Sequence, residues 1–449
     1  MIDLSPLKEN LRQKPIAVFG LGKSGLSVHA ACAAAGIETV LWDDNPKLVE
    51  EAQRLNATTE DLTYADFRRF SLLCLAPGVP LTHPSPHPVA AAALMAACEV
   101  VGDMELFHRA RPRAKTIGIT GTNGKSTVTA LVGHILQEAG AECAVGGNIG
   151  EPVLALPHLS ERGIYVLEMS SYQIDLCTTF APGIAALINL SPDHLDRHGG
   201  MEGYIAAKER IFRKNGVAVV GIDDAWSEGV FTRVKKTGAR LTVPVSCAEA
   251  APGGVTVTAE GIMQRDGKDI ADLKTCANLR GRHNWQNAGI AYALCAAAGI
   301  DDRDIVKGLT NFPGLAHRQK TVATLNGIAY INDSKATNDE AAAVALSTYS
   351  PVYWIAGGKS KGGGYAACEK HLPHVRHAFL IGEAAEEMRA WLEEKGVAAS
   401  VSVTLEQAVI SAHALAQKEN LPGGTVLLSP ACASFDQFKS FEHRGDAFA

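Results

Sequence analysis

Short apolar runs rich in β-branched residues alternate with helical patterns along most of this 449-residue chain. Such alternation is typical of βαβ units, in which helices cover the faces of mainly parallel sheets. At roughly 100–200 residues per domain, the length corresponds to two to four domains. We therefore predict an α/β protein of three domains, with boundaries at 1–102, 103–314 and 315–449.

Composition narrows the class of ligand. The chain has 42 basic and 48 acidic residues, a net charge of −6, and no basic block. This balance argues against a nucleic acid or an anionic membrane surface as the main partner. No apolar stretch reaches the roughly 18 residues that a membrane span needs. The ten cysteines are scattered singly without a C-x-x-C pair, as is typical of reduced thiols. We expect a cytoplasmic monomer that acts on a small molecule.

A first glycine cluster, Gly20–Gly25, lies between the predicted strand Ile16–Phe19 and an alanine-rich helix. Asp43 and Asp44 follow about twenty residues later, as in the dinucleotide fingerprint. In that fingerprint, glycines let the backbone approach a pyrophosphate at a helix N-terminus, and the acid meets a ribose hydroxyl. The cluster favours a Rossmann-like domain for NAD or FAD. Another nucleotide diphosphate, or a plain tight turn, remains an alternative.

A second glycine cluster, Thr120–Thr127, follows the predicted strand Thr116–Thr120 and precedes an amphipathic helix. In such loops backbone N–H groups cradle phosphates, a lysine such as Lys125 neutralises charge, and a hydroxyl such as that of Ser126 joins a Mg²⁺ shell. The strict P-loop pattern is not met, because Ile119 occupies its first glycine position. We still predict a P-loop-type ATP site in the central domain, with a structural turn as the alternative.

Polar residues follow two further predicted strands, at the ends where parallel strands deliver ligand-binding groups. Glu168 follows the run Ile164–Leu167, and the segment Asp193–His198 follows the run Ala185–Leu190. Carboxylate oxygens suit Mg²⁺, so these residues are candidate metal ligands. The alternative for each is a solvated strand-end loop.

Lys208 interrupts an apolar stripe of the predicted helix within Tyr204–Phe212. A lysine at the margin of such a stripe commonly extends its ammonium group to solvent, and the alternative is a lysine that points into the site. Two more polar clusters, Gly281–Asn287 and Asp333–Asn338, are candidate site segments or, alternatively, helix caps.

In this order, these segments resemble the Mur ligases of peptidoglycan synthesis and, more distantly, the folylpolyglutamate synthases. The similarity covers essentially the whole chain and is carried by Thr120–Thr127, Glu168, Asn189–Gly199, Lys208, Gly281–Asn287 and Asp333–Asn338. Within the family, Ser429–Phe438 with Phe441-Glu442 and Arg444-Gly445 resembles the C-terminal signature of the members that add D-glutamate. The Asp-Asn-Pro-Arg motif of the members that add meso-diaminopimelate is absent.

The resemblance implies a ligase that uses ATP and Mg²⁺ to add D-glutamate to UDP-N-acetylmuramoyl-L-alanine through an acyl phosphate. The first glycine cluster would then bind the UDP part of this substrate instead of NAD. The implied UDP-substrate contacts are Ser24, Asp43, Gly78, Asn148 and His194. The implied ATP contacts are Gly121, Thr122, Asn123, Gly124, Lys125, Ser126, Thr127, Asn287, Arg318, Asp333 and Lys335. The implied D-glutamate contacts, in a Rossmann-like C-terminal domain, are Thr337, Lys361, Ser434 and Phe441.

The same resemblance implies a catalytic group of Lys125, Glu168, His194 and Lys208. Ser126, Glu168 and His194 would hold metal. Members of the family carry the lysine equivalent to Lys208 as a carbamate, an anion that also supports metal. Three alternatives remain: a Mur-type ligase for another amino acid, an NAD-dependent oxidoreductase, and a nucleotide-binding regulator without chemistry.

Overall fold

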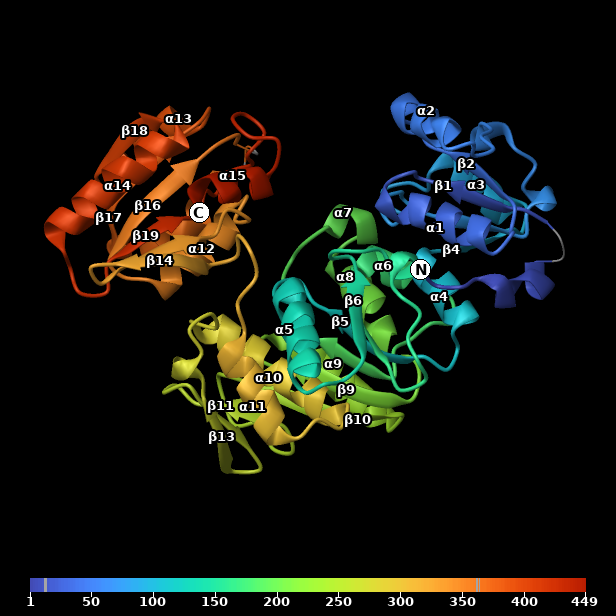
Figure 1. The fold of residues 1–449 in the computed structure, drawn as a ribbon, viewed down its shortest axis with the longest axis horizontal. Coiled ribbons are helices and arrows are strands. Elements are labelled where there is room, and N and C mark those ends of the chain that lie inside the picture. The colour runs from blue at the N-terminus through green and yellow to red at the C-terminus, as the bar shows by residue number, and fades with distance from the viewer. Residues whose placement is uncertain (12–13, 361, 363) are drawn as a thin grey trace. The chain divides into compact units, whose positions relative to one another are not determined.

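A computed structural model of the chain describes residues 1–11, 14–360, 362 and 364–449. The described residues form three β-sheets and divide into two compact units (Figure 1). Unit 1 contains Met1–Thr275 and Arg282–Phe312, and unit 2 contains Cys276–Gly281 and Pro313–Ala449. Two of the sheets belong to unit 1 and the third to unit 2.

The first sheet of unit 1 is parallel, with the strand order β2-β1-β3-β4. Its strands are β1 (Ile16–Phe19), β2 (Thr39–Trp42), β3 (Leu72–Leu75) and β4 (Glu99–Val101). Its helices are α1 (Lys23–Ala34), α2 (Pro46–Arg54) and α3 (Pro88–Met95), and α4 (Asp103–Ala110) follows β4. Ile16 and Val18 pack in the core that contains α1, whereas Ala17 and Phe19 pack in the core that contains α3. The predicted strand–turn–helix around the first glycine cluster is confirmed.

The second sheet has nine strands in the order β13-β12-β11-β10-β9-β8-β5-β7-β6. The strands are β5 (Lys115–Thr120), β6 (Cys143–Gly147), β7 (Ile164–Glu168), β8 (Ile184–Leu187), β9 (Gly216–Gly221), β10 (Arg240–Ser246), β11 (Val255–Val257), β12 (Ile262–Arg265) and β13 (Lys268–Asp272). All neighbouring pairs are parallel except β11–β12 and β12–β13.

Helices cover both faces of this second sheet. One face carries α5 (Lys125–Glu138), α10 (Arg282–Ala297) and α11 (Asp302–Asn311). The other face carries α6 (Ser171–Asp175), α8 (Met201–Glu209) and α9 (Ala225–Thr237), and the short α7 (Leu195–His198) precedes α8.

Strand β8 ends earlier than the sequence predicts, at Leu187 instead of Leu190. The reason is visible in the hydrogen bonds: the N–H of Leu190 donates to the side chain of Asp224 at 3.1 Å, not to a neighbouring strand. A side-chain acceptor therefore turns the chain out of the sheet three residues early and begins the loop that faces the second glycine cluster.

Unit 2 contains a six-stranded sheet in the order β14-β15-β19-β16-β17-β18, parallel except for the β14–β15 pair. The strands are β14 (Lys320–Leu325), β15 (Ile328–Asn332), β16 (Val352–Gly357), β17 (Val375–Ile381), β18 (Ala399–Val403) and β19 (Thr425–Leu428). The helices are α12 (Asp339–Thr348), α13 (Ala385–Glu394), α14 (Leu405–Glu419) and α15 (Phe441–Phe448).

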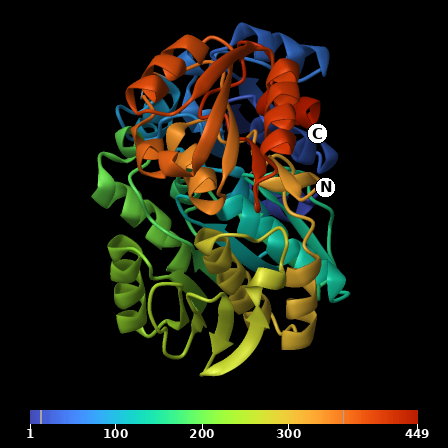
Figure 2. The same ribbon diagram turned by 90° about the vertical axis from the view of Figure 1, so that its left-hand side faces the viewer.

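Figures 1 and 2 show helices on both faces of the sheet of unit 2. Along β16, Val352 and Trp354 pack in the core with α12 and α13, whereas Tyr353 and Ile355 pack in the core with α14. The strand is apolar on both faces, as parallel strands between two helix layers must be. This explains why it reads as a continuous apolar run in the sequence.

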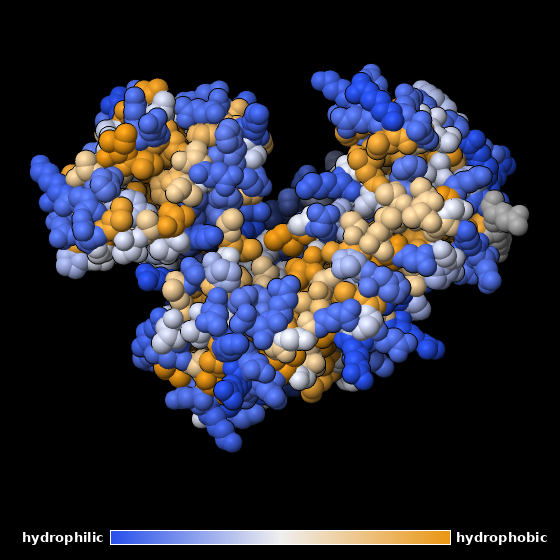
Figure 3. Space-filling model, in the orientation of Figure 1, coloured by the Kyte–Doolittle hydropathy of each residue, from blue (hydrophilic) through white to orange (hydrophobic). Residues whose placement is uncertain are grey.

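Hydrophilic residues are spread over the visible surfaces of both units and are interrupted by hydrophobic groups (Figure 3). Among the described residues, no helix combines the length and apolar character that a membrane span requires. All ten cysteines are free thiols, as predicted, and nine of them are buried.

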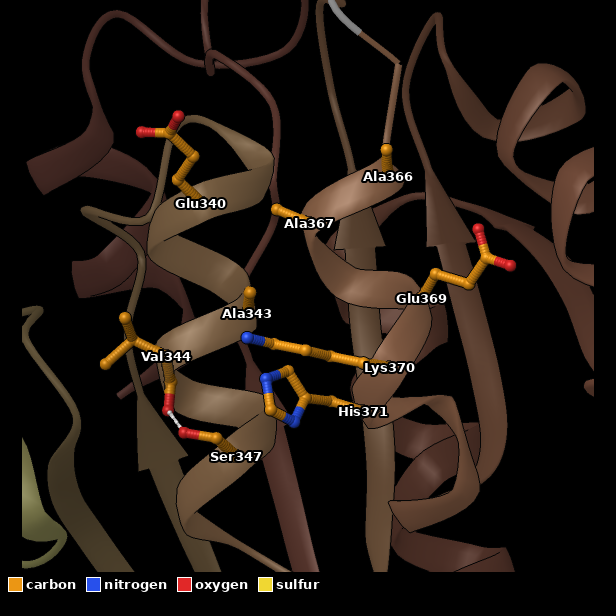
Figure 4. A pocket seen from close by; sticks show the side chains of 9 residues that line it. All are labelled: Glu340, Ala343, Val344, Ser347, Ala366, Ala367, Glu369, Lys370 and His371. Atoms are coloured by element: carbon orange, nitrogen blue, oxygen red, sulfur yellow. Dashed lines mark hydrogen bonds between the residues drawn. The ribbon is translucent and has the colours of Figure 1, made fainter. Parts of the chain in front are cut away.

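An open groove in unit 2 lies between α12 and the 3₁₀ helix η7 (Ala366–His374) (Figure 4). Lys370 extends from η7 toward α12 across the groove, and Glu340 stands on the α12 side. None of the predicted site residues that the structure describes lines this groove.

The buried carboxylate of Glu105 joins α4 to the segment that leads into β8. Glu105 is fully buried, and its Oε2 accepts hydrogen bonds from the backbone N–H groups of Thr179 and Phe180, both at 2.9 Å. Its Oε1 accepts from Arg109 at 3.0 Å. These donors hold the pKa of Glu105 at about 2, against the opposing effect of burial.

We predict that Glu105→Gln lowers the free energy of unfolding by about 2–3 kcal/mol at pH 7, because the lowered pKa of Glu105 is a measure of its stabilisation of the native state. This contribution is complete above the ordinary pKa of 4.5 and is lost as the pH falls toward about 2. Urea unfolding at several pH values from about 2.5 to about 7 measures this contribution of Glu105. Glu99→Gln is the matched control, since Glu99 pairs with the same arginine at the surface, where ion pairs contribute about 0–1 kcal/mol. Equal losses in the two variants would contradict the prediction.

Candidate functional site

The second glycine cluster forms the turn between β5 and α5, as predicted. Gly124 has a φ of 85°, in the left-handed region, which glycine adopts without steric cost. A Cβ atom at Gly124 would overlap the side chain of Asn287 at the start of α10. The absence of a side chain at Gly124 thus lets Asn287, a predicted ATP residue, lie against the loop.

The loop after β8 supports the glycine turn from the other side. The side chain of Asn189 accepts a hydrogen bond from the N–H of Asn123 at 2.8 Å, and its backbone carbonyl accepts from Thr122 at 3.0 Å. The hydroxyl of Thr122 accepts from the N–H of Ser191 at 3.0 Å. Asn189 lies in a segment that carries the family resemblance, but sequence reasoning assigned it no role. Its place as a polar residue at the end of the predicted run Ala185–Leu190 was the available signal.

Lys125 folds back over the turn. Its Nζ donates to the carbonyl of Gly121 at 2.9 Å and to that of Thr122 at 2.7 Å. The ammonium group is therefore held above the loop, where a phosphate cradled by the loop would meet it. Ser126, the next residue, is 6 % exposed.

Lys208 meets the same carbonyl from α8. The residue is 2 % exposed, and its Nζ donates to the carbonyl of Gly121 at 2.8 Å and to Thr120 Oγ1 at 3.3 Å. The ring of Tyr204, one turn earlier, lies 4.7 Å from the Nζ. The lysine points inward, so the expectation from the apolar stripe alone, a side chain that extends to solvent, is wrong, and the alternative is confirmed.

Burial and the charge of Lys125 lower the pKa of Lys208 well below its ordinary value, whereas Asp193 and Glu168 oppose that shift. Desolvation penalises the charged form of a buried amine. The structure therefore places Lys208, whose amine readily becomes neutral, beside Lys125, which is hydrogen-bonded to the glycine turn.

Glu168 ends β7 at the same edge of the sheet. It is 2 % exposed, and its Oε1 accepts a hydrogen bond from Asn148 Nδ2 at 2.7 Å. Its Oε2 is buried and has no hydrogen-bond partner among the described residues. A buried carboxylate oxygen without a donor is costly, and a hard cation such as Mg²⁺ would satisfy it. The donor set therefore fits a metal.

The described residues include no cluster of three or more His, Cys, Asp or Glu arranged as a metal site. Mg²⁺ does not require one, since it usually binds one or two carboxylates together with water and phosphates.

His194 is more exposed than Glu168. It has a φ of 52°, and its ring lies 5.2 Å from that of Tyr172. Its Nε2 lies 3.5 Å from the carboxylate of Asp193, and its side chain is 54 % exposed. The contacts described for it are thus with its own loop and with α6.

The predicted UDP-substrate residues of the first sheet lie around its glycine turn. Asp43 accepts hydrogen bonds from the backbone N–H of Leu21 and from that of Asn45, both at 2.7 Å, and so ties the turn to the start of α2. The hydroxyl of Ser24 bonds to the carboxyl group of Asp103. The carbonyl of Gly78 accepts from Arg197 of α7 at 2.9 Å.

In unit 2 the predicted residues gather where β15 and β19 end. The carboxyl group of Asp333 is buried and accepts from Ser429 Oγ at 2.8 Å and from the N–H of Gln319 at 3.2 Å. Burial raises the pKa of Asp333 to about 7, and the charge of nearby Arg318 opposes this. The Nζ of Lys335 lies 4.8 Å from the centre of the Phe441 ring. Predicted ATP and D-glutamate residues thus share one end of this sheet.

Arg444 of α15 holds these segments together. It is 1 % exposed and donates to Ser334 Oγ at 3.0 Å, to the Ser334 carbonyl at 2.8 Å and to the Cys432 carbonyl at 3.2 Å. Sequence reasoning placed Arg444 in the C-terminal signature but assigned it no role. A buried arginine among carbonyl groups has no periodic signal in the sequence.

The remaining predicted residues of unit 2 differ in what the structure describes. Ser434 is buried, and the N–H of Thr337 donates to the carbonyl of Lys335 at 2.8 Å. Asn338 caps α12 by accepting from the N–H of Ala341, so part of the segment Asp333–Asn338 does serve as a helix cap. Lys361 lies outside the described residues.

Comparison with known proteins identifies the family. Residues 119–295 match the Mur ligase middle domain, and residues 317–432 match the glutamate ligase domain of Mur ligases. A UDP-N-acetylmuramoylalanine–D-glutamate ligase of Paramagnetospirillum magneticum is 47 % identical over 98 % of this chain and 96 % of its own length. Enzymes of the same name from Caulobacter vibrioides and Rhizobium meliloti are also 47 % identical, over 97 % and 98 % of this chain and 94 % and 96 % of their own lengths.

Solved structures show the same fold at lower sequence identity. UDP-N-acetylmuramate-alanine ligase MurC from Thermotoga maritima gives a TM-score of 0.60 at 17 % identity, over 97 % of this chain and 98 % of that one. MurF from Acinetobacter baumannii gives a TM-score of 0.56 at 19 % identity, over 78 % of this chain and 82 % of that one. With two matching domains and relatives that are nearly half identical along almost the whole length, this chain belongs to the Mur ligase family.

Proposed function

We propose that this ligase joins D-glutamate to the L-alanine carboxylate of UDP-N-acetylmuramoyl-L-alanine with conversion of ATP to ADP and phosphate, as a cytoplasmic monomer. One observation carries the proposal: Lys125 and Lys208 meet on the carbonyl of Gly121, within a strand–glycine turn–helix unit that is built to receive phosphates. The names of relatives that are 47 % identical over nearly the full chain support the choice of substrates.

The reaction proceeds in two steps. A carboxylate oxygen of the substrate attacks the γ-phosphorus of ATP, the bond to the bridging oxygen of ADP breaks, and an acyl phosphate forms. The amine of D-glutamate then attacks the carbonyl carbon, and the tetrahedral intermediate expels phosphate and loses a proton to give the amide. The chain forms no covalent bond with either substrate, so catalysis depends on positioning and on electrostatic stabilisation.

Residues of unit 1 bind the substrates in these steps. The N–H groups of the loop Gly121–Ser126 bind the β- and γ-phosphates of ATP, and Lys125 neutralises charge on the transferred phosphoryl group. Asn287, beside Gly124, contacts the nucleotide. Asn148 orients the carboxylate of Glu168 and lies near the muramoyl peptide.

Mg²⁺ would be held by Glu168, Ser126 and His194. When bound, it would neutralise negative charge on the phosphate oxygens. The buried Oε2 of Glu168, which has no hydrogen-bond partner among the described residues, supports this assignment. Lys208, as a neutral amine, would add CO₂ and release a proton to form a carbamate, which places an anion beside the same metal.

In unit 2 we assign ATP contacts to Arg318, Asp333 and Lys335. We assign D-glutamate contacts to Thr337, Ser434 and Phe441, and to Lys361 beyond the described residues. The backbone N–H of Thr337 donates to the carbonyl of Lys335. This contact supports adjacent sites for the nucleotide and the incoming amino acid.

The substrates are tested by phosphate release with ATP, Mg²⁺ and UDP-N-acetylmuramoyl-L-alanine, with D-glutamate, L-alanine, L-lysine and meso-diaminopimelate offered in turn. We predict phosphate release at a rate at least tenfold higher with D-glutamate, and an amide product detected by mass spectrometry; tenfold corresponds to about 1.4 kcal/mol of discrimination. Faster release with another amino acid would assign this ligase to a different substrate. Reduction of NAD without ADP formation would favour the oxidoreductase alternative.

Replacing the loop lysine tests the phosphate site. We predict that Lys125→Ala lowers kcat/KM about 100–1000-fold, since it removes a preorganised positive charge from the transferred phosphoryl group. Lys307→Ala is the matched control, because Lys307 is an exposed lysine that pairs with Glu138 at the far end of α5. Undiminished ligation by Lys125→Ala would favour a site elsewhere and a nucleotide-binding role without chemistry.

The lowered pKa of Lys208 predicts carbamate formation. We expect ¹³C-labelled bicarbonate to give a carbamate signal in the NMR spectrum of the wild-type protein and no such signal in Lys208→Arg, because the guanidinium group stays protonated. The variant should lose about 100-fold or more of kcat, by analogy with the loss of one preorganised electrostatic group. A wild-type enzyme that is fully active without the signal, or an active Lys208→Arg, would overturn this assignment.

A further inference from the structure

A buried carboxyl group lies directly behind the glycine turn of the first sheet. Asp103, the first residue of α4, is 2 % exposed. Its Oδ1 accepts a hydrogen bond from the N–H of Met104 at 2.9 Å, and its Oδ2 accepts one from the hydroxyl of Ser24. Ser24 lies in the first turn of α1 and is partly exposed. The carboxyl group therefore acts on the surface of the turn only through this hydroxyl.

The surroundings of Asp103 disfavour its charged form. The ionisable groups described as interacting with it electrostatically are the thiols of Cys74 on β3 and of Cys177 after α6. Burial raises the pKa of both thiols, which keeps them neutral. Glu105, on the same helix, is engaged with Arg109 and Thr179. α1 contributes only the Ser24 hydroxyl to the hydrogen bonds described for the carboxyl group. Burial accordingly raises the pKa of Asp103.

The hydrogen bond between Ser24 and Asp103 conflicts with phosphate binding. A serine hydroxyl has one proton to donate and two lone pairs that accept. When Asp103 is ionised, Ser24 must donate that proton backward, and its lone pairs then face a pyrophosphate at the start of α1. When Asp103 is protonated, it donates to Ser24 Oγ, and the Ser24 proton is free for a phosphate oxygen.

We propose that Asp103 is a positioning residue that takes up a proton when the UDP-linked substrate binds and thereby turns the hydroxyl of Ser24 toward the pyrophosphate. This inference rests on the proposed function, in which Ser24 contacts that substrate. The negative charge of the pyrophosphate favours the protonated carboxyl group, so binding and protonation support each other. Linkage then requires that affinity falls as the pH rises above the pKa of Asp103 in the free protein.

Calorimetry measures the proton directly. UDP-N-acetylmuramoyl-L-alanine is titrated into the protein at pH values from about 6 to about 9. Each titration is repeated in a pair of buffers that differ in ionisation enthalpy, because the difference in measured heat gives the number of protons taken up. Its pyrophosphate is a diester and does not titrate in this range. We expect the wild-type protein to take up a proton on binding. Asp103→Asn should abolish the uptake and weaken affinity less than about threefold, since its amide can donate to Ser24 permanently. Asp103→Ala should weaken affinity about tenfold, because the Ser24 hydroxyl loses the hydrogen bond to Asp103 that orients it toward the pyrophosphate.

A double-mutant cycle separates this role from a general structural one. If Asp103 acts through Ser24, then Ser24→Ala combined with Asp103→Ala weakens binding no more than Ser24→Ala alone. Asp66→Asn is the control. Asp66 also stands at the start of a helical segment, next to the first sheet, but it lies at the surface. It should leave both affinity and proton uptake at wild-type values.

Two results with the variants would overturn the inference: proton uptake that persists in Asp103→Asn, or additive losses in the cycle. If Asp103→Ala does not fold, as judged by its thermal melting, the Asn variant alone decides the question through its proton uptake. Failure of the wild-type protein to bind UDP-N-acetylmuramoyl-L-alanine would instead contradict the proposed function itself. Binding without proton uptake would leave that function intact and exclude the role of Asp103.

Discussion

The carbonyl oxygen of Gly121 is the point on which the site of unit 1 depends. It accepts hydrogen bonds from the Nζ atoms of both Lys125 and Lys208, and this brings a partly buried amine and a buried amine together. Burial first, and then repulsion by the charge of Lys125, lower the pKa of Lys208, the more buried of the two amines. The arrangement becomes favourable when one amine is neutral or chemically modified, or when anions arrive. Phosphates bound at the glycine turn, as in the proposed function, would supply such anions.

Buried ionisable groups beside neutral partners recur at the strand ends of both units. Asp103 accepts from a hydroxyl and an amide, Asp333 accepts from a hydroxyl and an amide, and Arg444 donates to carbonyl groups and a hydroxyl. Each such group costs stability, because desolvation of a charge is incompletely compensated by neutral hydrogen-bond partners. Their pKa values move accordingly: burial raises that of Asp333 to about 7 and lowers that of Arg444 to about 10. Such clusters at ligand-binding edges are typical of functional sites.

Local sequence predicted the elements that carry the glycine turns, because strand and helix periodicities and turn chemistry act over a few residues. The strands Ile16–Phe19 and Thr116–Thr120 and the helix after Lys125 lie where the pattern indicates. The end of β8 was predicted three residues too late, since the side chain that terminates it, Asp224, comes from a distant segment. The orientation of Lys208 also stayed open in the sequence, because an amphipathic stripe does not tell whether a lysine at its edge turns in or out.

By itself, the sequence determined the fold class, the strand and helix that flank each of the two glycine turns and, through its resemblance to a family, the type of reaction. The tertiary structure alone decided which groups meet: Asn287 beside Gly124, Asn148 on Glu168, Lys335 over Phe441, and Ser24 on Asp103. The physical reason is the range of the interactions. Periodicity and turn preferences depend on neighbours along the chain, whereas desolvation and hydrogen bonding depend on atoms that are brought together only when strands distant in sequence pair side by side.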